Sequence, residues 1–131
     1  MAEWVYDNPN PRNRRTDDCV VRAVSIASGQ TWDETYAGVA LTGLALSDMP
    51  NMNHVWRFYL RGLGFKRKEI QDTCPDCYTV NDFADEHPHG RYVLGTGTHA
   101  VAVVDGRVMD TFDSRELIPM YYYYLEEDQY A

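Results

Sequence analysis

The stretch DDCVVRAVSIASG, residues 17–29, is the clearest amphipathic segment of the chain. Its apolar residues follow the spacing i, i+3, i+4, i+7 that defines one face of a helix: Val20, Ala23, Val24 and Ala27. Asp17 or Asp18 can cap the start of this helix, and Gly29 can end it. The spacing therefore predicts a helix that carries Cys19 in its first turn.

The stretch HAVAVVDGRVMD, residues 99–110, predicts a β-hairpin. Asp105-Gly106 favours a two-residue turn, because both central positions of a type I′ turn need positive φ. With this turn, Val104 pairs with Arg107 across the hairpin. The same register fixes which side chains of the two strands share a face, because successive residues of a strand point to opposite faces.

The sequence around these two segments has helices first and strands later. Thr31-Trp32-Asp33-Glu34 is a capping box that opens a second helix, and a third is expected over residues 51–63. A short helix is expected to start at Thr79, and strands are expected over 91–94, 99–104, 107–111 and 117–125. This order predicts an α+β fold in which N-terminal helices precede a small antiparallel sheet. We expect residues 1–131 to form one domain, with residues 1–16 as an extended lead-in interrupted by prolines.

Composition and charge exclude several classes of protein. The 131 residues carry a formal net charge of −8, from 20 acidic and 12 basic side chains. This balance argues against a nucleic-acid partner. The chain has no run of 18 apolar residues and no signal peptide, which argues against a membrane span and against secretion. Three cysteines cannot form a disulfide framework, so we expect a cytoplasmic protein with reduced thiols.

Three residues of the predicted elements form a candidate nucleophilic site. The unpaired N–H groups and the dipole of a helix N-terminus favour the thiolate of Cys19. His99, at the start of its strand, can act as the general base, and a base of this kind needs a third group to orient it. Asp110 shares the face of His99 on a diagonal of about 7–8 Å, within reach of the two side chains. Asp113 has the other parity unless the turn contains a bulge.

With these motifs the sequence resembles the papain-like cysteine peptidase superfamily, and in particular small papain-like proteins of bacteriophages and gut bacteria. The resemblance covers residues 17–114 and implies a Cys19 nucleophile, a His99 base and an orienting Asp110. It implies hydrolysis of a peptide, isopeptide or amide bond of a peptide or protein substrate through a thioester. The resemblance implies no cofactor, and it implies a location in the cytoplasm of a bacterial or phage-infected cell.

Two positions depart from the family pattern. Many members carry a glutamine five or six residues before the cysteine, where its amide helps to hold the oxyanion. Asn13 and Arg14 occupy these positions here, and Asn13 is the candidate for that role. Asp113-Ser114 resembles the Asn-Ser pair that carries the third member in papain. Asp113 therefore stays open as an alternative to Asp110.

A second constellation lies between the two motifs of the candidate site. Cys74-Pro75-Asp76-Cys77 is a C-x-x-C motif, and with His87 and His89 it offers a tetrahedral zinc set, although the spacing departs from the usual zinc patterns. Unligated loop thiols and a disulfide are the alternatives for the two cysteines. A different class of function stays open as well. The chain can be a non-enzymatic interaction module that keeps the fold and binds a phage or host factor, with zinc as a possible stabiliser.

Overall fold

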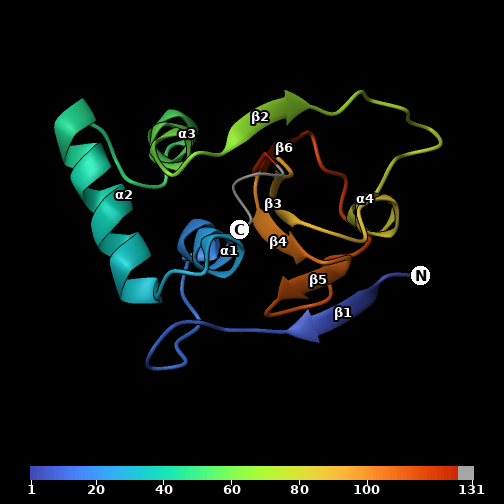
Figure 1. The fold of residues 1–131 in the computed structure, drawn as a ribbon, viewed down its shortest axis with the longest axis horizontal. Helices are drawn as coiled ribbons and strands as arrows, with labels where there is room; N and C mark the ends of the chain where they lie inside the picture. Colours follow the sequence, from blue (N-terminus) through green and yellow to red (C-terminus); the bar gives the residue numbers. More distant parts are fainter. Residues whose placement is uncertain (127–131) are drawn as a thin grey trace.

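The computed structural model of the 131-residue protein describes residues 1–126. Within that range the chain forms an α+β fold of four helices and six strands (Figure 1). The elements are β1 (Glu3–Tyr6), α1 (Cys19–Ser28), α2 (Trp32–Leu46), α3 (Asn53–Gly62), β2 (Lys66–Glu69), α4 (Val80–Glu86), β3 (Arg91–Gly95), β4 (Ala100–Val104), β5 (Arg107–Asp110) and β6 (Tyr121–Tyr124). None of the helices in this range is both long and apolar enough for a membrane crossing.

The six strands form one mixed sheet with the order β1-β5-β4-β3-β6-β2. Four neighbouring pairs are antiparallel, but β1 runs parallel to β5. The prediction of a purely antiparallel sheet is therefore wrong at its edge, where part of the expected lead-in is a strand. The four residues of this edge strand are too few to show a recognisable apolar pattern. The strand is held by backbone hydrogen bonds to β5, and these depend little on the identity of the side chains.

The helices cover the two faces of this sheet unequally. In Figure 1, α1 lies between the sheet and α2, α3 lies beside β6 and β2, and α4 lies at the other side of the sheet. Small residues on both sides of the contact let α1 approach β4 closely: Ala23, Ala27, Ala100 and Ala102 are all buried in one apolar cluster. A second cluster on the opposite face joins α4 to the sheet through Phe83, Val101 and Val108. Tight packing on both faces fixes β4 and α1 relative to each other.

The local signals in the sequence place the helix ends correctly. The helix α1 starts at Cys19, and Gly29 ends it in a left-handed conformation with φ of 78°. The predicted capping box forms at Thr31, and a second capping box forms at Thr79, where a helix start was expected. The buried residues of α3 are Val55, Trp56 and Leu60. Phe58 is 56% exposed on the other side of the helix.

The hairpin of β4 and β5 has the predicted register. Asp105 and Gly106 both have positive φ, of 50° and 75°, and Val104 pairs with Arg107. The tyrosine run of β6 lies inside the sheet, between β3 and β2, so both of its faces pack against the protein. Tyr121 and Tyr123 contact the cluster on the α1 side, which brings them toward the N-terminus of α1.

Gly95 of β3 pairs with Tyr121 of β6, whose ring lies where a side chain at Gly95 would be. A Cβ added at Gly95 would lie 2.2 Å from the ring of the buried Tyr121. We expect Gly95→Ala to lower the free energy of unfolding by about 1–3 kcal/mol, because the ring has to move within a packed core. Urea denaturation measures this change. Gly62→Ala is the matched control, because nothing lies within 4 Å of a Cβ at that position. Equal stabilities of the two variants would contradict the prediction.

Candidate active site

Cys19 is the first residue of α1, and no side chain caps the N-terminal end of this helix. Asp18 is the N-cap residue, but its carboxylate makes no hydrogen bond to the N–H groups of the first turn. The N–H of a residue at this position has no partner within the helix. The prediction that an aspartate side chain caps the helix is therefore wrong. The free N–H groups and the dipole act on the thiol instead.

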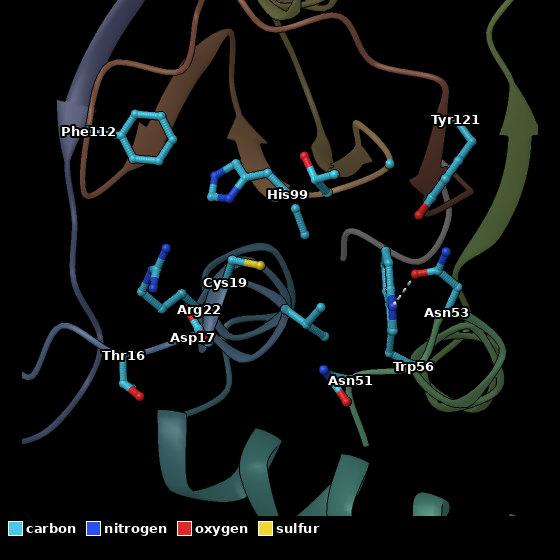
Figure 2. Close-up of a pocket in the computed structure, with 14 residues that line it drawn as sticks. Thr16, Asp17, Cys19, Arg22, Asn51, Asn53, Trp56, His99, Phe112 and Tyr121 are labelled. Carbon is cyan, nitrogen blue, oxygen red and sulfur yellow. Dashed lines mark hydrogen bonds between the residues drawn. The ribbon is translucent and has the colours of Figure 1, made fainter. Parts of the chain in front are cut away.

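His99 and Asp110 meet where β4 begins and β5 ends. His99 directly precedes β4, Asp110 is the last residue of β5, and Nε2 of His99 lies 2.7 Å from Oδ2 of Asp110. The thiol of Cys19 lies beside the same imidazole, and each group shifts the pKa of the other. Since Asp110 occupies Nε2, Nδ1 is the ring nitrogen left for the thiol. Figure 2 shows the ring of His99 above Cys19, facing the start of α1. The structure thus brings the three candidate residues together.

The protonation states of these residues are coupled. Burial raises the pKa of the Cys19 thiol, but the hydrogen bond from His99, the N–H of Ala100 and the charges of His99 and Arg22 outweigh it, so the pKa is lowered. Burial lowers the pKa of His99, but its bonds with Asp110 and Cys19 raise it to about 9. The pKa of Asp110 is lowered because His99 outweighs the effect of burial. These directions favour a thiolate–imidazolium pair around neutral pH.

A buried arginine that the sequence analysis did not include connects Asp110 to the start of α1. Arg22 is 8% exposed, pairs with Asp18 one helical turn earlier, and places Nη2 3.6 Å from Oδ1 of Asp110. Asp18 also accepts a hydrogen bond of 2.9 Å from Nε1 of Trp32. The i, i+4 spacing of Asp18 and Arg22 was the available signal, but such pairs are usually exposed. Here the pair holds the acid that orients His99.

A cavity of about 490 Å³ opens over Cys19 and His99. Figure 2 shows its wall running from Phe112 and Arg22 on one side of Cys19 to Trp56 and Tyr121 on the other. Two amide side chains near the start of α3, Asn51 and Asn53, also line it. Nε1 of Trp56 donates to Oδ1 of Asn53 at 3.2 Å, so the NH₂ group of Asn53 is the part of this amide left for a ligand.

A second, mainly apolar hollow of about 260 Å³ adjoins the cavity. It shares Thr16, Asp17, Val20 and Asn51 with the larger cavity. Most of its remaining lining comes from Trp32, Tyr36 and Val39 of α2 and from Pro50, which follows that helix. The space around Cys19 therefore extends toward α2 as well as toward β6, which suits a chain-like ligand better than a small compact one.

Two of the predicted site residues lie elsewhere. Asp113 binds Arg115 through both carboxylate oxygens, at 2.8 and 2.7 Å, and so faces away from His99. The structure thus selects Asp110 as the partner of the imidazole. Asn13 lies exposed in the lead-in loop, where its side chain accepts a hydrogen bond from Asn8 at 3.2 Å. Asn13 does not line the cavity, because the loop carries it away from the start of α1.

The predicted zinc set is not assembled. Cys74 and Cys77 are joined by a disulfide, which was one of the three alternatives for this pair. His87 stacks on Phe83, with ring centroids 3.8 Å apart. Among residues 1–126, no group of three or more histidine, cysteine or acidic side chains is placed to hold a metal ion. The cysteine that remains free is Cys19.

Comparison with known proteins leaves the interpretation to this geometry. No protein-family model matches the chain, and neither the curated proteins nor the solved structures searched contain a match.

Proposed function

We propose that this protein is a thiol hydrolase of papain-like design that cleaves a peptide, isopeptide or amide bond. The observation that carries the proposal is the position of the His99 imidazole, which pairs with the Asp110 carboxylate at 2.7 Å and lies beside the Cys19 thiol in the same cavity. A nucleophile, a base within hydrogen-bond reach and a third group that orients the base are the parts that covalent catalysis requires. Cys19 is in addition half-buried at the floor of an open cavity.

The first half of the proposed reaction is acylation. The Cys19 thiolate attacks the substrate carbonyl, a C–S bond forms, and the carbonyl oxygen takes the negative charge. The N–H of Cys19 and a side-chain amide from Asn51 or Asn53 hold this oxyanion. The His99 imidazolium then gives its proton to the leaving amine, the C–N bond breaks, and a thioester remains on Cys19.

The second half releases the product. Neutral His99 takes a proton from a water molecule, and the resulting hydroxide attacks the thioester carbonyl. The C–S bond breaks, so the acid product leaves and the thiolate–imidazolium pair forms again. Asp110 keeps the ring of His99 in one orientation through both halves, and Arg22 holds Asp110 from its other oxygen.

An active ester tests the proposal without knowledge of the natural substrate. With p-nitrophenyl acetate, we expect a burst of about one equivalent of nitrophenolate, because acylation of a thiolate is faster than hydrolysis of the thioester. Stopped-flow absorbance measures the burst. Mass spectrometry of acid-quenched protein should find the acetyl group on Cys19.

Cys19→Ala is the control, and it should show neither the burst nor the acetyl group. If the wild-type protein gives no burst while its fold is intact, the proposal is wrong. The interaction module then becomes the better description, and binding to its partner should tolerate Cys19→Ser.

A further inference from the structure

A basic pocket lies on the same face of the protein as Cys19, between α3 and β2. It encloses about 260 Å³ and is lined by Arg57, Arg61, Phe65, Lys66, Arg67 and Tyr123. Four of the six lining residues are cations, in a chain whose formal net charge is −8. Residues 57–68 contain no acidic side chain at all. We refer to this hollow as the arginine pocket.

The two arginines of α3 give this pocket uncompensated charge. Arg57 and Arg61 are one helical turn apart and exposed, and no ion pair involves either of them within residues 1–126. The other two cations are paired, Arg67 with Glu69 at 2.5 Å and Lys66 with Glu126 at 2.7 Å. Exposed arginines on one helix face bind carboxylates in a two-pronged geometry. The pocket is thus suited to an anionic ligand.

The lining of the pocket favours an acidic peptide over a nucleic acid. Phe65 and Tyr123 form the apolar part of the wall and are only 4% and 3% exposed. Rings that are buried in this way offer no open face on which bases can stack. They do lower the local dielectric beside the arginines, which strengthens a contact with a carboxylate.

The arginine pocket and the cavity over Cys19 lie along the same face of β6. Tyr121 lines the cavity and Tyr123 lines the pocket, two residues further along the same face of β6, a step of about 7 Å. The guanidinium of Arg67 lies 4.3 Å from the centroid of the Tyr121 ring. Trp56 contacts both tyrosines, at centroid distances of 6.1 and 5.3 Å. A few residues of extended peptide therefore span the two sites.

We propose that the arginine pocket binds acidic side chains of the peptide that Cys19 attacks, so that the substrate is an acidic segment. This inference rests on the proposed thiol hydrolase function. It adds a requirement on the substrate, since carboxylates a few residues from the reacting carbonyl hold the peptide in the cavity. Arg57 and Arg61 are then the residues that select it.

Two electrophilic peptides test this requirement. The first peptide is chloroacetyl-Gly-Gly-Glu-Glu-Glu, and its counterpart has three glutamines in place of the glutamates. Each peptide is also made in a second form that carries the chloroacetyl group at the other end. The Cys19 thiolate displaces chloride, so a C–S bond forms as the C–Cl bond breaks, and mass spectrometry follows the rate. We expect the better-oriented glutamate peptide to label Cys19 at least about tenfold faster than its glutamine counterpart at low salt.

Two double variants connect this advantage to the arginine pocket. Arg57→Gln with Arg61→Gln should remove it, while iodoacetamide, which is too small to reach the pocket, should label Cys19 at an unchanged rate. Arg12→Gln with Arg107→Gln removes the same charge from exposed positions outside the pocket and should keep the advantage.

Three outcomes would overturn the inference. Equal labelling by the two peptides, at rates above those of the unfolded protein, removes the acidic requirement and leaves the hydrolase proposal intact. Labelling of Cys19 no faster than in the unfolded protein removes both proposals. If hexathymidylate abolishes the advantage at lower concentration than a Glu₆ peptide does, the pocket binds nucleic acid instead.

Discussion

His99→Ala should slow the reaction of Cys19 with iodoacetamide at pH 6 by about 100-fold or more, because the thiolate then loses the imidazolium that stabilises it. The imidazole contributes both a hydrogen bond and a positive charge that lower the pKa of the thiol. Without them, burial is the largest remaining influence, and it raises that pKa. The reagent reacts with the thiolate only, so the rate follows the ionised fraction. Alkylation rates measured by mass spectrometry across the pH range give this comparison.

The sign of the pH dependence follows from the two coupled groups. In the wild-type protein, the rate should stay high as the pH falls below the range of an ordinary thiol, and should drop only when the pH passes the lowered pKa of Cys19. Above about pH 9, His99 loses its proton, and the thiolate remains without its cationic partner. The His99→Ala profile should instead rise only at alkaline pH.

His54→Ala is the matched histidine control. His54 is exposed, lies 3.0 Å from Asp48, and does not line the cavity. Its removal should leave the pH profile of Cys19 unchanged. If the His99→Ala profile coincides with that of the wild-type protein, the histidine does not activate the thiol, and the proposed mechanism fails.

Arg22→Met should lower the free energy of unfolding at pH 7 by about 3–5 kcal/mol, because it leaves buried carboxylates without their cation. Arg22 lies between Asp18 and Asp110, which are only 6% and 3% exposed. Methionine keeps much of the apolar length of the side chain but supplies no charge. His99 still pairs with Asp110, so Asp18 is the carboxylate that loses most of its compensating charge. Urea denaturation measures the change.

Two further variants separate this charge effect from packing. Arg22→Met combined with Asp18→Asn should recover part of the loss, because the second change removes a carboxylate that has become unpaired. Arg107→Met removes an exposed arginine from β5 and should change the stability by no more than about 0.5 kcal/mol. If Arg22→Met is as stable as the wild-type protein, the buried pair contributes nothing net.

Local patterns allowed much of the fold to be predicted. The start of α1, its end at Gly29, both capping boxes and the register of the β4–β5 hairpin depend on short-range chemistry that neighbouring residues express. The edge strands were harder to predict from the sequence. Neither β1 nor β2 carries an apolar alternation of useful length, since each is a four-residue strand at an edge of the sheet.

The residues of the candidate site were also predictable only where local patterns place them. Cys19, His99 and Asp110 could be proposed because a helix start and a hairpin register each fix the direction of a side chain. The position of Asn13 could not be predicted in the same way, because it lies in a loop outside the cavity, and the path of a loop depends on distant contacts. The disulfide of Cys74 and Cys77 likewise depends on how their loop folds.

The sequence by itself determined the helix that presents Cys19 and the hairpin that places His99 and Asp110 on one face, since both follow from spacings of a few residues. The tertiary structure alone decided that these two elements meet, that Arg22 is buried against Asp110, and that the arginine pocket and the cavity share one face of β6. These contacts join residues far apart in the chain. They arise when the small residues of α1 and β4 pack together, and no local pattern encodes the resulting distances.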